Sequence, residues 1–228
     1  MEVDCKSTGS AYVGSNPTLP IRSNSSAVEH LLYTEIVGGS IPSSSILQYN
    51  AMNYVEQCSN IIGNHDISFV EDDIINFIKM RRRWPHGTLS VINYSRGNSN
   101  IVYESDGFLN YPKVKKLYDL GFTIQAPHVL DLTEGLRELN DKLYTVRGCE
   151  TVGNFYFSKG TSNLPSFSPH THGYCVVVKP IYGQAEWLVG EDTFIAGPSD
   201  VILIPAECPH AVVTGEEPRL SITFNLDE

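Results

Sequence analysis

Two histidines one residue apart precede an apolar run in the segment "SPHTHGYCVVVKP". Side chains two residues apart on an extended backbone leave the same face, so the rings of His170 and His172 are expected to point the same way. A third histidine, His210, follows the segment "DVILIPAECP". Three convergent imidazoles can hold a divalent metal and leave other positions open for a substrate or for oxygen. The three histidines are therefore a candidate metal site, and two surface histidines before a strand remain the alternative for the HxH pair.

The sequence after Glu150 is dominated by short strand-like runs, which would have to position these histidines. Gly, Pro or Ser separates each run from the next. Evenly spaced strands with turns between them are typical of an antiparallel barrel or a double-sheet roll. The predicted strands are "TVGNFYFS", "YCVVVKPI", "AEWLVG", "DVILIPA", "HAVVTG" and "RLSITFNL".

The chain before these strands divides into two parts. Residues 1–27 are rich in Ser, Gly, Asn and Pro, so they are predicted to form a mobile arm. Residues 28–148 alternate helix-like segments, such as "LTEGLRELNDKLYTVRG", with the strand-like runs "TLSVINY" and "FTIQAPHV". In the quoted helix Thr133 is the expected N-cap and Gly148 the expected stop. We expect a helical and mixed α+β lead-in that packs on a barrel core of residues 149–228.

The composition excludes some classes of protein. The formal net charge is -10, which argues against nonspecific nucleic-acid binding because that binding depends on neutralising phosphates with Lys and Arg. No stretch approaches the roughly 18 apolar residues of a spanning helix, and the N-terminus lacks the pattern of a signal peptide. The 5 cysteines are odd in number and form no CxxC pair, which favours free thiols in a reducing compartment. A cytoplasmic protein with no nucleic-acid or membrane partner is expected.

The histidine segments resemble the paired motifs of the cupin superfamily, in which HxH or HxD/E opens one strand and G-x-D-x₄-P-x₃-P-H follows later. Here the two motifs stand as "HTH" and "GPSDVILIPAECPH". The segments "HTHGYCVVVKPIYGQAEW", "LYDLGFTIQAPHVLDLTEGLRELNDKL" and "GNFYFSKG" are similar to the JmjC-type, ribosomal-oxygenase-like branch, and the likeness covers residues 68–226. The resemblance implies a mainly β fold, a double-stranded β-helix (cupin or jelly-roll barrel) with the N-terminal lead-in, which binds Fe(II) and 2-oxoglutarate.

This resemblance assigns roles to particular residues. His170, His172 and His210 match the three metal-ligand positions of the branch. Asn154 matches an asparagine that lines the cosubstrate pocket, and Thr223 falls near a threonine on the final strand.

Two positions depart from the pattern of the branch. His172 stands where the branch has an acid, which leaves three neutral ligands. Ala185 stands where the branch has the lysine that pairs with 2-oxoglutarate, so another cation is needed if the cosubstrate is kept.

Two cations are candidates for that anchor. Arg219 lies nine residues after His210, where a sister branch of 2-oxoglutarate oxygenases places an arginine, and Ser221 shares its face. A guanidinium suits a carboxylate because it forms two parallel charge-assisted bonds. Lys179 is the second candidate. The structural alternatives are a solvated Arg219 after the acidic turn "GEEP" and an edge lysine whose stem covers apolar neighbours.

Three functions follow as hypotheses. The first is a non-haem metal-dependent oxygenase, which uses Fe(II) and 2-oxoglutarate to oxidise a small molecule or peptide. The second is a three-histidine cupin dioxygenase that acts without 2-oxoglutarate, and the third is a non-catalytic cupin that binds a metal or ligand. Imidazole ligands suit several divalent metals, so other metals than iron stay open, as does a homodimer.

Overall fold

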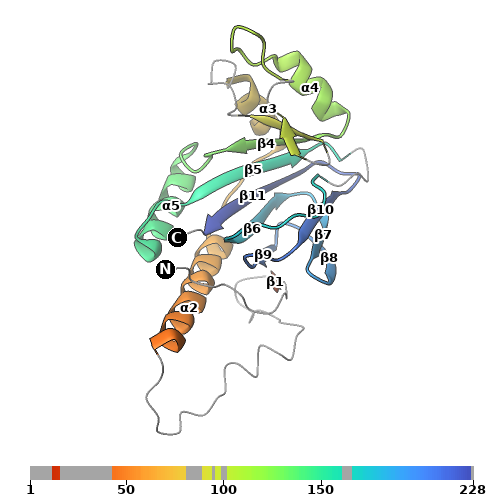
Figure 1. The fold of residues 1–228 in the computed structure, drawn as a ribbon. Helices are drawn as coiled ribbons and strands as arrows, with labels where there is room; N and C mark the ends of the chain where they lie inside the picture. Colours follow the sequence, from red (N-terminus) through yellow and green to blue (C-terminus); the bar gives the residue numbers. More distant parts are fainter. Residues whose placement is uncertain are drawn as a thin grey trace.

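Two antiparallel sheets form the body of the protein (Figure 1). The computed structural model describes residues 12–15, 43–80, 89–93, 96–98, 102–160 and 166–226. The larger sheet has eight strands in the order β1-β9-β6-β11-β5-β4-β2-β3, and the smaller has three in the order β10-β7-β8. The strands are β1 (Tyr12–Ser15), β2 (Ser90–Asn93), β3 (Arg96–Asn98), β4 (Thr123–Pro127), β5 (Val152–Ser158), β6 (Cys175–Tyr182), β7 (Ala185–Val189), β8 (Asp192–Ala196), β9 (Asp200–Ile204), β10 (His210–Thr214) and β11 (Arg219–Leu226).

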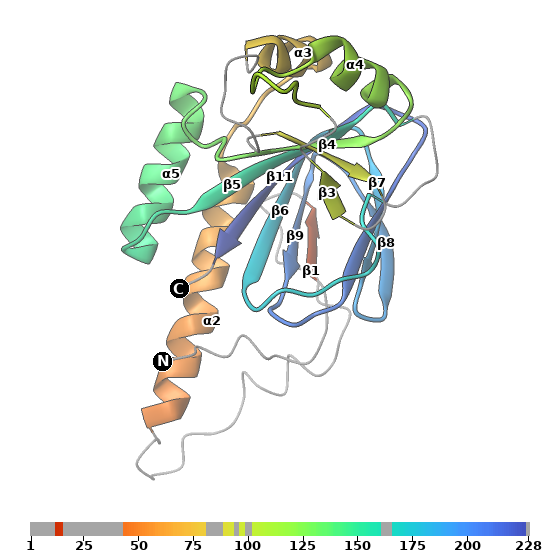
Figure 2. The same cartoon turned by 45° about the horizontal axis from the view of Figure 1, so that its top comes forward.

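Four helices are described, and they lie along or above the larger sheet (Figure 2). They are α2 (Ser43–Asn64), α3 (Glu71–Met80), α4 (Tyr111–Asp119) and α5 (Glu134–Arg147). The prediction of a mainly β, cupin-like fold with a helical lead-in is confirmed. Helix α5 has the predicted ends: the Thr133 hydroxyl accepts a hydrogen bond from Leu136 N, and Gly148 takes the left-handed conformation with φ 71°.

The central strands of the larger sheet are buried on both faces. On β11 the even-numbered side chains are apolar and lie in the core under the helices, as do Phe155 and Phe157 of β5. The odd-numbered side chains of β11 face the smaller sheet. A second apolar cluster, which includes Val178, Trp187 and Ile202, fills part of the space between the two sheets.

The lead-in shares both sheet and core with the barrel strands. Strand β4 pairs with β5 in the register Ile124↔Phe157, and helix α2 contacts α5, β9 and β6. The ring of Phe155 on β5 packs edge-on against Phe69 and Phe77, with centroids 5.2 and 5.9 Å away. Burying an aromatic side chain contributes about 1.5–3 kcal/mol. These contacts join the two parts of the chain across one continuous core.

Two features of the N-terminal arm and the cysteines refine the sequence predictions. Strand β1 pairs antiparallel with β9, and the other residues of the predicted arm 1–27 lie outside the described residues. Cys58, Cys149 and Cys208 are free thiols. Cys175 is disulfide-bonded, so the expectation of free thiols is wrong at this position.

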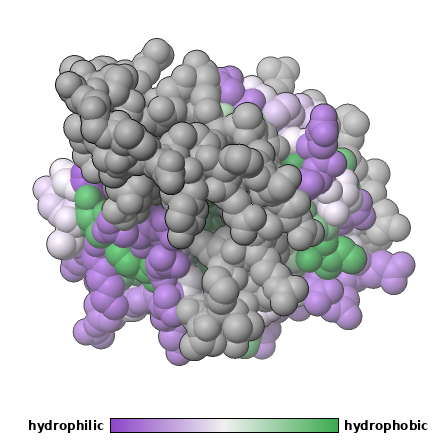
Figure 3. All heavy atoms as spheres, turned by 90° about the horizontal axis from the view of Figure 1, so that it is seen from below, coloured by the Kyte–Doolittle hydropathy of each residue, from purple (hydrophilic) through white to green (hydrophobic). Residues whose placement is uncertain are grey.

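Among the described residues no helix is both long and apolar enough to cross a membrane. The described part of the face in Figure 3 is mostly hydrophilic, and its hydrophobic atoms form small, separate groups.

We propose that residues 28–148 and 149–228 unfold together. Limited proteolysis is expected to trim residues within 1–27 and leave the remainder intact, because cleavage between β4 and β5 would have to break a continuous sheet. Mass spectrometry of the digest checks this. Rapid cleavage within residues 80–150 into two stable fragments would contradict it.

Candidate functional site

The structure brings the three predicted histidines together at one end of the space between the sheets. His210 is the first residue of β10, and its backbone exchanges two hydrogen bonds with His170, at 3.0 and 3.1 Å. His172 lies three residues before β6. The ring centroid of His210 is 4.3 Å from that of His170 and 4.7 Å from that of His172, and the latter two centroids are 6.3 Å apart.

Each of the three rings uses the same nitrogen to contact a backbone carbonyl. The Nδ1 atoms of His170, His172 and His210 lie 3.0, 2.7 and 3.0 Å from the carbonyl oxygens of Ser168, Tyr174 and Cys208, respectively. In the neutral ring this contact places the proton on Nδ1, which donates it to the carbonyl. The lone pair is then on Nε2, and a backbone carbonyl partner of this kind is typical of metal-binding histidines.

The electrostatic surroundings favour neutral rings, which is the form that binds a metal. Burial lowers the pKa of His210 to about 4, and the neighbouring rings of His170 and His172 lower it as well. Burial is also the main cause that lowers the pKa of His172. The donor set therefore fits a divalent metal ion.

The side chains as placed do not form a finished coordination sphere. Within the described ranges no group of three or more His, Cys, Asp or Glu side chains is positioned to hold a metal ion. Two imidazoles that bind one ion through nitrogen at about 2.1 Å have ring centres at most about 6.5 Å apart. The wide His170–His172 separation lies just inside this limit, so closure requires the exposed His170 ring to turn.

Aromatic rings that the sequence did not single out surround the histidines. The ring of Tyr174 stacks on His172 with centroids 4.4 Å apart and an interplanar angle of 7°. Phe167 packs against His170 at 5.1 Å, and Tyr156 packs against Phe167 at 6.1 Å. The spacing of Tyr174, two residues after His172, is the one signal that could have predicted its position.

Four of the five predicted cosubstrate residues, all but Lys179, share one polar face between the sheets. Arg219, Ser221 and Thr223 follow one another at the two-residue period of β11. Asn154 on the neighbouring strand donates from Nδ2 to the Thr223 hydroxyl at 3.3 Å, and its register partner is Thr223. Asn154, Arg219 and Ser221 are all buried.

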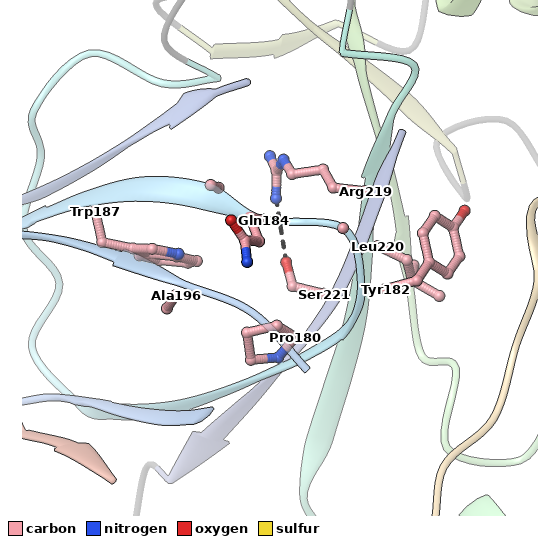
Figure 4. A pocket seen from close by; sticks show the side chains of 10 residues that line it. Pro180, Tyr182, Gln184, Trp187, Ala196, Arg219, Leu220 and Ser221 are labelled. Carbon is pink, nitrogen blue, oxygen red and sulfur yellow. Dashed lines mark hydrogen bonds between the residues drawn. The ribbon is translucent and has the colours of Figure 1, made fainter. Parts of the chain in front are cut away.

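Arg219 is a buried cation without a carboxylate partner in the described part of the chain. Its side chain is 4% exposed and donates to the hydroxyls of Ser221 and Ser166 at 3.2 and 2.7 Å, and Figure 4 shows the contact with Ser221. The Nε atom has no hydrogen-bond partner, and neither does the buried hydroxyl of Ser158, its neighbour across the sheet. Burial lowers the pKa of Arg219 to about 10, so the group stays charged at neutral pH.

The space beside Arg219 is small as the side chains stand. Its lining includes Gln184, Ala185 and Trp187, and its volume is about 10 Å³, which is room for about one water molecule. Arg219 thus reaches the same pocket as Ala185, the position where the resembling branch has its lysine.

Lys179 is not brought to this group. Its ammonium donates to the carbonyl of Pro198 at 3.0 Å, and it lines a groove of about 350 Å³ with His65 and Asp66 at the end of α2. The neighbours Val178 and Pro180 have the opposite orientation on β6.

Comparison with known proteins supports the fold more than a function. Residues 152–224 match the family model of the AraC-like ligand binding domain, which is a cupin-like domain. A search of curated proteins found no match.

Solved structures with a similar fold include the ribosomal oxygenase YcfD from Escherichia coli, in complex with cobalt and succinic acid (15% identity, TM-score 0.49, 72% of this chain and 46% of that chain). Two others are the DMSP lyase DddQ from Ruegeria pomeroyi (22%, TM-score 0.31, 34% and 39%) and salicylate 1,2-dioxygenase from Pseudoaminobacter salicylatoxidans (12%, TM-score 0.29, 33% and 19%). The chain spans less than half the length of each of these three. All three TM-scores are below 0.5, and similarity at this level says nothing about function.

Replacing His210 with Ala is expected to lower the content of bound divalent metal at least tenfold, because two imidazoles would remain. Metal analysis after anaerobic loading with Fe(II) measures this. The matched control is His128→Asn, since His128 is an exposed histidine with φ 55° and asparagine tolerates that conformation. Full metal content in the His210→Ala variant would remove this histidine from the site.

Proposed function

We propose that this protein is a non-haem metal-dependent oxygenase that uses Fe(II) and 2-oxoglutarate to oxidise a small molecule or peptide. The observation that carries the proposal is the buried guanidinium of Arg219, which has no carboxylate partner among the described residues and lies in the same inter-sheet space as the imidazoles of His172 and His210. Burying a charge without a partner is costly, so an inward-facing Arg219 implies an anionic ligand.

Chain geometry limits the distance between the anchor and the histidines. Ser166, which accepts a hydrogen bond from Arg219, is four residues before His170, and its amide donates to the carbonyl of Val212 on β10. Four residues of chain span at most about 14 Å. The side chains of Arg219 and of the histidines cover part of this distance. A short dicarboxylate could therefore extend from Arg219 towards the rings of His170 and His210.

Different side chains would contact different parts of such a ligand. Arg219 would hold the far carboxylate with two parallel bonds, and the hydroxyls of Ser221 and Ser166 would orient it. The pair formed by Asn154 and Thr223 lies further along the same polar face.

The ion itself would be held by the Nε2 atoms of His170, His172 and His210. Bound iron would supply oxygen activation. The apolar side chains of the second cluster, including Val178 on β6 and Trp187 on β7, would exclude water from the reacting groups.

Two alternatives have an observation in their favour. His172 occupies the position of the acid in the resembling branch, which favours a three-histidine dioxygenase that acts without 2-oxoglutarate. The match to an AraC-like ligand binding domain favours a cupin that binds its ligand without catalysis. Consumption of 2-oxoglutarate in air separates the proposal from the first alternative, and any oxygen uptake excludes the second.

Arg219→Gln is expected to raise the half-saturating concentration of 2-oxoglutarate at least tenfold and to leave metal content unchanged, because it removes the charged anchor but none of the metal ligands. Oxygen uptake at varied 2-oxoglutarate measures the first quantity and metal analysis the second. The control is Lys179→Gln, in which the cation on the opposite face of β6 is removed. An unchanged value for Arg219→Gln would exclude Arg219 as the anchor.

Binding of 2-oxoglutarate under nitrogen is expected to raise the Tm of the metal-loaded wild-type protein, because a ligand that binds only the folded state stabilises it. The Arg219→Gln variant is expected to show less than half of that shift. Equal shifts in the two proteins would count against an anion site at Arg219.

A further inference from the structure

Glu207 has a backbone conformation that its residue type does not favour. It lies in the loop between β9 and β10 and has a φ of 59°. Glycine takes this left-handed region at no steric cost, whereas other residues are uncommon there and pay for it. Residues in unfavourable backbone conformations cluster at functional sites, where contacts with the surrounding structure hold them in place. A glutamate in this conformation therefore suggests that its side chain has a function.

The contacts of Glu207 direct it to the histidine site. Its backbone amide donates to the carbonyl oxygen of His172 at 2.8 Å. Its Oε1 atom lies 3.4 Å from the place where a side chain on Gly173 would begin, so the carboxylate lies beside the residue that follows His172. Within the described chain this exposed carboxylate has no hydrogen bond or ion pair.

Three imidazole ligands do not neutralise the charge of a bound metal ion, whereas a nearby carboxylate can. His170, His172 and His210 are neutral donors, so a bound dication would keep its full charge within the protein. The described contact of Glu207 with the site is its backbone hydrogen bond to His172, and its carboxylate lies beside Gly173. Its position suits an influence through space on the ion rather than direct ligation.

We propose that Glu207 acts on the metal centre through its charge: its carboxylate offsets the charge of the bound ion from outside the ligand set. The inference rests on the proposed function only in requiring that the three histidines bind a divalent metal. It does not depend on 2-oxoglutarate.

The test measures Co(II) affinity under nitrogen by calorimetric titration of the full chain. Glu207→Gln keeps the shape of the side chain and removes its charge, and it is expected to weaken Co(II) binding about threefold, because an exposed charge acts on the ion through solvent. The matched control is Glu186→Gln on β7, an exposed glutamate whose neighbours Ala185 and Trp187 are the ones that face the inter-sheet space. Glu186→Gln is expected to bind Co(II) like the wild type.

A second variant separates this role from a structural one. Glu207→Gly is expected to weaken Co(II) binding to the same extent, while the Tm of the metal-free protein is equal to or above that of the wild type, because glycine relieves the left-handed conformation. Unchanged affinity in Glu207→Gln overturns the inference. A lower Tm of the metal-free Glu207→Gly protein overturns it too, because Glu207 would then serve the fold of the loop.

The result for Glu207 can be distinguished from the result for the proposed use of 2-oxoglutarate. If wild-type protein binds Co(II) and Glu207→Gln weakens it, but 2-oxoglutarate has no effect on either protein, the role of Glu207 stands and the 2-oxoglutarate proposal fails. If wild-type protein binds no divalent metal, both fail.

Discussion

The two-residue period of strand β11 is the constraint on which the rest of the structure depends. This strand has neighbours on both sides in the larger sheet and is covered on both faces, so every side chain on it must suit a buried environment. Leu220, Ile222 and Phe224 meet this demand against the helices. The alternate face instead carries Arg219 and Ser221, which are polar and yet buried. A polar face in this position is stable only if hydrogen bonds or a ligand satisfy it, and that requirement ties the fold to function.

The ends of the strands determine the histidine site in the same way. His210 begins β10 and pairs with His170, while His172 precedes β6, so two chain segments bring the three histidines to one end of the space between the sheets. Backbone carbonyls at these ends fix the Nδ1 side of each ring, which orients Nε2 without using another side chain. The same loop that delivers His210 also holds Glu207 against His172, so the local backbone couples the carboxylate to the rings.

Sequence patterns predicted the parts of this arrangement that depend on local order. The HxH pair, the strand runs and the Thr133 and Gly148 ends of α5 all reflect short spacings, and the structure contains each of them. Strand β8 was missed because it lies at an edge, where polar residues and the exposed apolar Ile195 give no alternating pattern. The stacking of Tyr174 on His172 and the disulfide at Cys175 depend on the placement of side chains, which spacing alone does not determine.

The two candidate cations illustrate why orientation decides chemistry. Lys179 and Arg219 both lie on central strands, but the ammonium of Lys179 already has a backbone carbonyl partner on the outer face, which leaves it no role inside the barrel. Arg219 is held inside by the hydroxyls of Ser166 and Ser221, and a hydroxyl can accept one hydrogen bond while it donates another. Ser221 can therefore keep accepting from the guanidinium and turn its own proton towards an arriving carboxylate, and Ser166 can do the same when the Thr123 hydroxyl, 2.7 Å away, donates to it. Neutral, rotatable partners thus hold the cation before binding without competing for the charge, whereas a resident acid would have occupied the site.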